Sequence, residues 1–409
     1  MTTAMAVAMM LAPAAIAKTA PEPVVTPEAK AAYLQDKPAD AQRLFAHVLD
    51  DGQNAAVLNQ MRSALAAFQL GDSKIAATTL DEARTPIEAV FSDTDDAKKA
   101  RSVWSKEASK RFLGEGYERA MVYYYRGLLF LEAGDYENAA ASFKGGQLQD
   151  ALTENVENSQ DFASLAYLRG WAGKCAGEAT VAEESFAEAA RLKPALTAPD
   201  AAANTLVIFE TGGAPEKVGE GKYKETLTYQ ESDIAPAASF AVNDAPAAAV
   251  EAEDLFWQAT SRGHRQMDTL LSNKAKTKAG TAATGQALTT VGAAMMQQSY
   301  FSNNNNMAAM GGVAMLGGLF ASAMAAKMTP AADIRQWDNL PQKVYLYPMT
   351  LTADAPVKVV ATGADGVASE AIVRVLGQPN CRVVWARTNS ALNVPDMAPG
   401  VTVQQGKRK

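Results

Sequence analysis

The stretch Tyr117 to Gly146, YERAMVYYYRGLLFLEAGDYENAAASFKGG, carries the clearest structural pattern in this chain. Its apolar periodicity predicts two antiparallel helices joined at Gly134 and Asp135. Large residues are expected to meet small ones along a seam between the helices, formed by Tyr124, Gly127, Leu131, Ala139 and Phe143. One such pair cannot bury its apolar face alone, so further pairs are expected on either side of it.

The same spacing of small and large residues occurs twice more. One copy runs through Ala64, Gly71, Asp72, Ala76, Leu80 and Ala83, and another through Gly170, Gly177, Glu178, Ala182, Phe186 and Ala189. The last copy stops at Pro194, which cannot continue a helix. Three matches at fixed offsets predict a short tetratricopeptide-like solenoid, with generic helical hairpins as the alternative. Such a solenoid presents a concave groove to a protein partner.

Composition places the chain among ordinary globular proteins. Its 409 residues are 48% hydrophobic and 20% charged, which suffices for two or three compact units. The net charge of -7 argues against nucleic acid, whose binding requires clustered Lys and Arg. We therefore expect protein partners, and no nucleic acid.

The N-terminus resembles an export signal. An apolar run ends at Ala15-Ile16-Ala17, the small-x-small pattern of signal-peptidase cleavage, although no Lys or Arg precedes that run. We expect residues 1–17 to be removed, so that the mature chain begins at Lys18 in the periplasm or at the outer membrane. The alternatives are a translation start further upstream and an apolar helix that is retained.

Changes of periodicity divide the rest of the chain and predict an α+β fold. Leu206 to Phe209 predict a strand, with Lys222 to Tyr229 as its candidate partner. Several alternating segments after Val344 predict a small antiparallel sheet or sandwich. The expected units are a Pro-rich spacer (18–39), a helical domain (40–200), β strands with an Ala/Pro linker (201–250), a helix (251–278), an uncharged helical hairpin (279–327) and a C-terminal β domain (328–409).

The segment from Ala279 to Ala326 contains no charged residue. Small residues recur at every fourth position in its second half, at Ala314, Gly318, Ser322 and Ala326, and such a ridge lets two helix backbones approach closely. The favoured interpretation is a buried helical hairpin. Insertion or docking at a membrane or a partner pore is the main alternative, and a disordered linker is the other.

The sequence contains no constellation of residues that indicates catalysis. The two histidines, His47 and His264, have no second ligand at metal spacing. The two cysteines, Cys175 and Cys381, are expected to be buried free thiols, with one disulfide as the alternative. We therefore expect no enzymatic activity, no cofactor and no bound metal.

Four separated stretches resemble an uncharacterised family of tetratricopeptide-containing envelope proteins of Gram-negative bacteria. They are Gly114 to Glu118, Leu206 to Lys217, Ala332 to Trp337, and Leu340-Pro341. Within them the motif residues are Tyr117, Glu118, Pro215, Asp333, Arg335, Trp337, Leu340 and Pro341. The resemblance implies an exported protein with a helical half and a small β part, associated with outer-membrane machinery such as curli-type secretion channels. Many members are lipoproteins, whereas this chain has no cysteine near the cleavage site.

These observations predict a non-enzymatic scaffold of the bacterial envelope that binds a protein partner through its helical groove, as an accessory to an outer-membrane secretion or surface-assembly system. The alternative is a membrane-active or pore-accessory protein that inserts residues 279–326.

Overall fold

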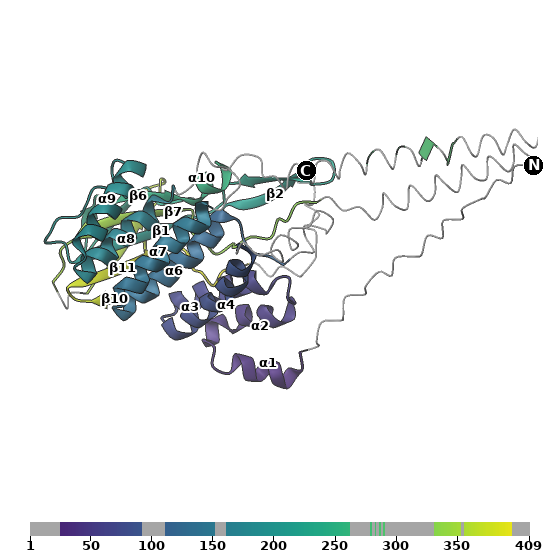
Figure 1. Cartoon of the computed structure of the whole chain (residues 1–409), viewed down its shortest axis with the longest axis horizontal. Helices are drawn as coiled ribbons and strands as arrows, with labels where there is room; N and C mark the ends of the chain where they lie inside the picture. The colour runs from purple at the N-terminus through teal and green to yellow at the C-terminus, as the bar shows by residue number, and fades with distance from the viewer. Residues whose placement is uncertain are drawn as a thin grey trace, which may run out of the picture.

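The structure is a computed structural model, which describes residues 25–91, 111–151, 161–261, 331–352 and 356–394, with a few separate positions between 279 and 290. Helices and sheets both contribute to the fold, as the α+β prediction requires (Figure 1). Three features predicted above lie outside the described residues: the export signal, His264, and the ridge formed by Ala314, Gly318, Ser322 and Ala326.

Three antiparallel helix pairs follow one another in the N-terminal half (Figure 1). They are α3 (Ala56–Gln69) with α4 (Ser73–Phe91), α6 (Gly116–Ala133) with α7 (Tyr136–Ala151), and α8 (Ala163–Ala176) with α9 (Ala179–Leu192). Before them come α1 (Pro27–Leu34), the 3-10 turn η1 (Ala39–Ala41) and α2 (Gln42–Asp50). The segment expected to be a Pro-rich spacer contains helix α1. A helix can start there because Pro27 is favoured in a first helical turn and the Thr26 hydroxyl caps the Ala29 N–H.

The predicted small-against-large seams are present in two of these pairs. A Cβ atom on Gly127 would lie 2.3 Å from Phe143 Cε1, and a Cβ on Gly170 would lie 2.8 Å from Phe186. Gly134 ends α6 in the left-handed conformation that glycine adopts readily. Tyr124 differs from its predicted place on the seam, because its hydroxyl donates to Glu210 of the neighbouring sheet.

A five-stranded mixed sheet is the centre of the β part. Its order is β10 (Ile372–Gln378), β11 (Cys381–Arg387), β1 (Thr205–Thr211), β7 (Lys343–Met349) and β6 (Val250–Asp254). The prediction of a separate antiparallel sheet after Val344 is wrong, because β11 pairs in parallel with β1. The expected pairing of Leu206–Phe209 with Lys222–Tyr229 is also wrong, because β1 lies between β11 and β7. Both strands are buried along their whole length, which is typical of parallel strands covered on both faces.

A second sheet and a hairpin complete the β part. The four-stranded sheet has the order β5 (Ala245–Ala247), β4 (Ser239–Val242), β8 (Val359–Thr362) and β9 (Ala368–Glu370), and the hairpin joins β2 (Glu216–Glu220) to β3 (Thr226–Gln230). The expected Ala/Pro linker therefore carries strands, and Asn243 and Asp244 take the positive φ angles of a tight turn. The helix expected from residue 251 begins as β6, and α10 (Leu255–Thr260) follows it.

Alternation along β1 shows how the layers pack. Leu206 and Ile208 belong to the core shared with the helices, whereas Val207 and Phe209 pack against the four-stranded sheet. The result is a layer of helix pairs, a central sheet and an outer sheet.

The central sheet lies on the first helix of each pair. Phe68 of α3 meets Trp385 of β11 with ring centroids 5.1 Å apart, and Ser164 of α8 donates to Glu253 of β6. In α6, Tyr124 and Tyr125 both donate to Glu210 of β1. The face that α3, α6 and α8 share is therefore covered by the protein's own sheet.

A disulfide joins the two layers. Cys175 at the end of α8 is bonded to Cys381 at the start of β11, with their Cα atoms 5.7 Å apart. The prediction of two free thiols is wrong. The cysteines are 206 residues apart in sequence, and only the packing of the sheet on the helices brings them together.

Candidate functional site

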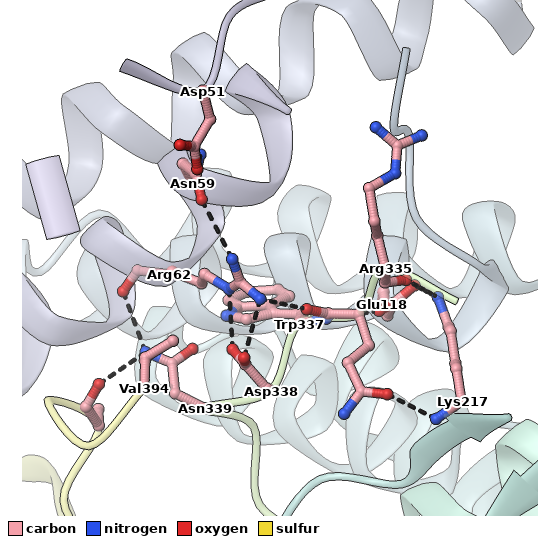
Figure 2. A network of polar contacts seen from close by, with 12 residues as sticks. Asp51, Asn59, Arg62, Glu118, Lys217, Arg335, Trp337, Asp338, Asn339 and Val394 are labelled. Carbon is pink, nitrogen blue, oxygen red and sulfur yellow. Dashed lines mark hydrogen bonds and ion pairs between the residues drawn. The ribbon is translucent and has the colours of Figure 1, made fainter. Parts of the chain in front are cut away.

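The loop Arg335 to Asn339 lies between α3, α6 and β2, and its polar contacts form the candidate site. We call this site the junction, and it consists of the loop together with Arg62, Glu118 and Lys217. Figure 2 shows Arg62 and Lys217 reaching the loop from opposite sides. Four parts of the chain that are distant in sequence, namely α3, α6, β2 and the loop, therefore meet at one place.

Glu118 is the central acid of the junction. It lies in the first turn of α6, where the partial positive charge of a helix N-terminus favours a carboxylate. Its Oε2 accepts from Lys217 Nζ at 2.6 Å and from the Glu115 N–H at 2.7 Å, and its Oε1 accepts from the Trp337 N–H at 2.8 Å. Because Glu118 is fully buried, each of these bonds replaces water that the carboxylate has lost.

Lys217 on β2 neutralises this buried acid and also contacts the loop. Its Nζ donates to the Arg335 carbonyl at 3.0 Å, and its backbone N–H donates to Gln336 Oε1 at 2.5 Å. The ammonium also lies 5.3 Å from the ring centroid of Phe112, within cation–π distance. Lys217 thereby forms an ion pair with Glu118 and also holds the loop in position.

Arg62 on α3 holds the other side of the loop. Its Nε and Nη2 donate to the two carboxylate oxygens of Asp338, each at 2.8 Å, in a bidentate pair. Nη2 also donates to the Gln336 carbonyl at 3.2 Å. Burial raises the pKa of Asp338, whereas the neighbouring Arg62 charge lowers it.

A second buried cluster adjoins the junction. Glu210 of β1 accepts from the hydroxyls of Tyr124 and Tyr125 and pairs with Arg387 of β11 at 3.3 Å. Arg387 Nη2 also donates to the Asn339 carbonyl at 2.6 Å, which connects the two clusters. Burial raises the pKa of Glu210, and the Arg387 charge opposes that shift.

The geometry of the junction and the adjoining cluster is typical of contacts that hold structural elements together. The acids of both clusters are buried, or nearly so, and accept from donors fixed on neighbouring elements. Within the described ranges, no group of three or more His, Cys, Asp or Glu could hold a metal ion. What these contacts do is fix the loop, and with it the central sheet, against α3 and α6.

Comparison with known protein families, curated proteins and solved structures finds no match. Of the helices that the structure describes, none is both long and apolar enough to cross a membrane.

The motif residues singled out in the sequence converge at the junction or beside it. Glu118, Arg335 and Trp337 belong to it directly, and Arg335 forms a bidentate pair with Asp333 at 2.8 and 2.6 Å. The remaining motif residues are buried in the same body: Tyr117, Pro215, Leu340 and Pro341. Their shared location is structural, because they anchor the segments that join the helices to the sheets.

The predicted repeat-packing residues lie mostly inside the helix pairs. Those that are fully buried are Ala76, Ala83, Ala139, Phe143 and Ala189. Phe186 is 6% exposed, whereas Ala182 is only partly buried. Pro194 follows the last residue of α9, Leu192, as a helix terminator should.

Sequence reasoning missed Arg62, Asp338, Glu210 and Arg387. A signal existed for two of them, because Arg62 and Glu210 are lone charges within apolar runs. Such a charge indicates a buried pair. The residues that pair with them, Asp338 and Arg387, lie more than a hundred residues away, and no local sequence pattern identifies them as partners.

Proposed function

We propose that this protein is an exported, non-enzymatic interaction scaffold of the bacterial envelope, and that its helix pairs are tetratricopeptide-like repeats. The repeat assignment is supported by the matching positions of Gly127 and Gly170 against Phe143 and Phe186. Gly134 and Gly177 also end their helices in the same left-handed conformation. In such repeats each pair buries the face of its neighbour.

The disulfide supports export. Structural disulfides persist in oxidising compartments such as the bacterial periplasm and are rare in the cytosol. The Cys175–Cys381 bond agrees with the cleavage pattern at Ala15 and Ala17. N-terminal sequencing of the endogenous protein should give Lys18 as the first residue, and recovery of Met1 would refute the export part of the proposal.

The observation that carries the scaffold proposal is where the described chain stops before residues 279–326 and resumes after them. Helix α10, after which the described chain stops at Ser261, packs on β3. On the return side, the Ala332 N–H donates to the Lys224 carbonyl at 2.8 Å, and Ala332 packs on Leu227 of β3. Both ends of the intervening stretch, which includes the uncharged residues 279–326, are thus held at the β2–β3 hairpin.

This arrangement supports a partner contact outside the helical groove. The inner face of α3, α6 and α8 is covered by the central sheet, so it offers a partner no free surface. We propose that the rigid body instead presents residues 279–326 to a protein of the envelope, as an accessory to an outer-membrane assembly system. The absence of charge from that segment also supports the alternative, in which it inserts into the bilayer.

Deletion of residues 279–326 tests the proposal. The variant, closed by a short Gly/Ser linker, should keep the thermal unfolding midpoint of the wild type but lose its retention in the envelope fraction. A carbonate wash of wild-type envelopes distinguishes binding to a protein partner from insertion into the bilayer. The wash releases a protein that is held by a protein partner, whereas a protein with an inserted segment stays in the membrane. Unchanged envelope retention of the deletion variant would contradict both versions.

A further inference from the structure

The outer face of α9 is a shallow apolar groove. It has a volume of about 550 Å³ and runs past Ala179, Ala182, Phe186 and Ala190, with the segment 197–199 as its side wall. Helix α9 belongs to the last of the three helix pairs, so no later pair of the described chain lies against this face.

The equivalent face of the preceding helix pair, on α7, is covered by the next pair. Phe143 and Gln147 on α7 occupy the positions that Phe186 and Ala190 occupy on α9. Gln147 is fully buried, and its Nε2 donates to Glu188 Oε1 of α9, because α8 and α9 cover that side of α7. Ala190, in contrast, stays partly exposed. No helix of the part of the chain that the structure describes covers this face of α9, which combines an apolar groove with exposed charges.

Charges on α9 favour another copy of α9 as the helix that covers this face. The exposed residues Glu183, Ala187 and Arg191 are spaced four apart and share one face of the helix. The acid lies in the N-terminal half and the base at the C-terminal end. Two α9 helices placed antiparallel, with a two-fold axis at Ala187, bring Glu183 of each chain opposite Arg191 of the other. The small side chain at the axis lets the helices approach closely.

We propose that the protein forms a symmetric homodimer through the outer face of α9, in which each copy covers the open end of the other's helical layer. The contact uses one helix and its side wall, which is less area than obligate dimers bury. The dimer is therefore a weak one, with a Kd on the order of micromolar.

Sedimentation equilibrium of the full, disulfide-bonded chain tests the dimer by charge reversal. Glu183→Arg and Arg191→Glu each place like charges opposite one another and should raise the Kd about ten-fold or more. Combining the two substitutions restores opposite charges in both symmetric pairs and should restore the wild-type Kd. The matched control is Glu137→Arg, at an exposed position of α7 away from α9's outer face, which should leave the Kd unchanged.

Thermal unfolding followed by circular dichroism shows whether each variant is folded, and the comparison uses only those with a wild-type midpoint. Two outcomes would overturn the proposal. One is a wild-type chain that remains monomeric at about 100 μM, far above a micromolar Kd. The other is a dimer that neither single reversal weakens, because its interface then lies elsewhere.

Discussion

Buried charges stabilise a fold only while both members of each pair are present. The Glu118 and Lys217 side chains are 0% and 2% exposed, and their contacts hold the loop that carries Trp337. By contrast, the Lys358–Asp244 pair has side chains that are 51% and 82% exposed. Surface pairs of that kind contribute little, because water and salt screen them.

Replacing Lys217 by Met should therefore destabilise the protein strongly. The change leaves the Glu118 carboxylate buried without its cation and should lower the free energy of unfolding by about 3 to 5 kcal/mol. The measurement is the urea unfolding midpoint, with Lys358→Met as the control expected to cost less than about 1 kcal/mol. Adding Glu118→Gln to Lys217→Met should recover part of the loss, because the amide removes the buried charge but can accept only one of the two backbone N–H bonds that Glu118 accepts. Equal effects of the two Lys variants would show that the junction contributes no more than a surface pair.

Glu253 should make stability depend on pH. This fully buried acid accepts hydrogen bonds from Ser164 and Gln258. Burial raises its pKa more than these bonds and the Lys193 charge lower it, so that the pKa rises from 4.5 to about 7. Between pH 4.5 and 7, the Glu253 carboxyl group is ionised in the unfolded chain but still protonated in the folded chain. Its contribution to the free energy of unfolding is therefore full below pH 4.5 and is lost as the pH rises through 7.

Glu253→Gln isolates that contribution, because the amide keeps a similar shape and does not titrate. Relative to the variant, the wild type should lose about 1 to 3 kcal/mol of unfolding free energy between pH 5 and pH 8. Urea unfolding at both pH values measures the difference. Parallel pH profiles of wild type and variant would mean that the Glu253 pKa is not raised.

At the scale of elements, close contact between α6 and α7 depends on a glycine facing a phenylalanine. A methyl group on Gly127 would overlap the Phe143 ring, with 2.3 Å between Cβ and Cε1. The same arrangement of Gly170 and Phe186 sets the approach of α8 to α9. In both of these pairs the phenylalanine ring occupies the space that a side chain on the glycine would need.

Gly127→Ala should accordingly destabilise the protein, even though alanine favours helix formation. Overpacking costs about 1 to 3 kcal/mol, against a propensity gain of about 1 kcal/mol. Phe143→Ala should cost about 3 to 5 kcal/mol because it leaves a cavity. In a double-mutant cycle measured by chemical denaturation, Gly127→Ala with Phe143→Leu should lose less than the sum of the two single changes. Strict additivity would show that these residues do not touch.

For the whole molecule, the disulfide connects the helical layer to the central sheet. It spans 206 residues, so it removes many conformations from the unfolded chain. Replacing both cysteines by Ala should lower the free energy of unfolding by about 4 to 5 kcal/mol. The same loss should appear in the wild type under a reducing agent. Maleimide labelling of the denatured, unreduced protein should find no free thiol, and labelling of both cysteines would contradict the bond.

The sequence determined the features that depend on local periodicity. The helix pairs, the glycine between α6 and α7, the burial of Phe143 and the existence of β1, β7, β10 and β11 all follow from spacings within about twenty residues, because helices and strands repeat at fixed periods. The motif residues of the junction were also visible, but only as separate stretches.

The tertiary structure alone decided which distant surfaces meet. The parallel pairing of β1 with β11, the Cys175–Cys381 bond and the Arg62–Asp338 pair join residues far apart in the chain, and no local pattern encodes their register. The same holds for the covered face of α3, α6 and α8. An apolar helix face shows that something must bury it, and whether a partner or the protein's own sheet does so depends on how the whole chain packs.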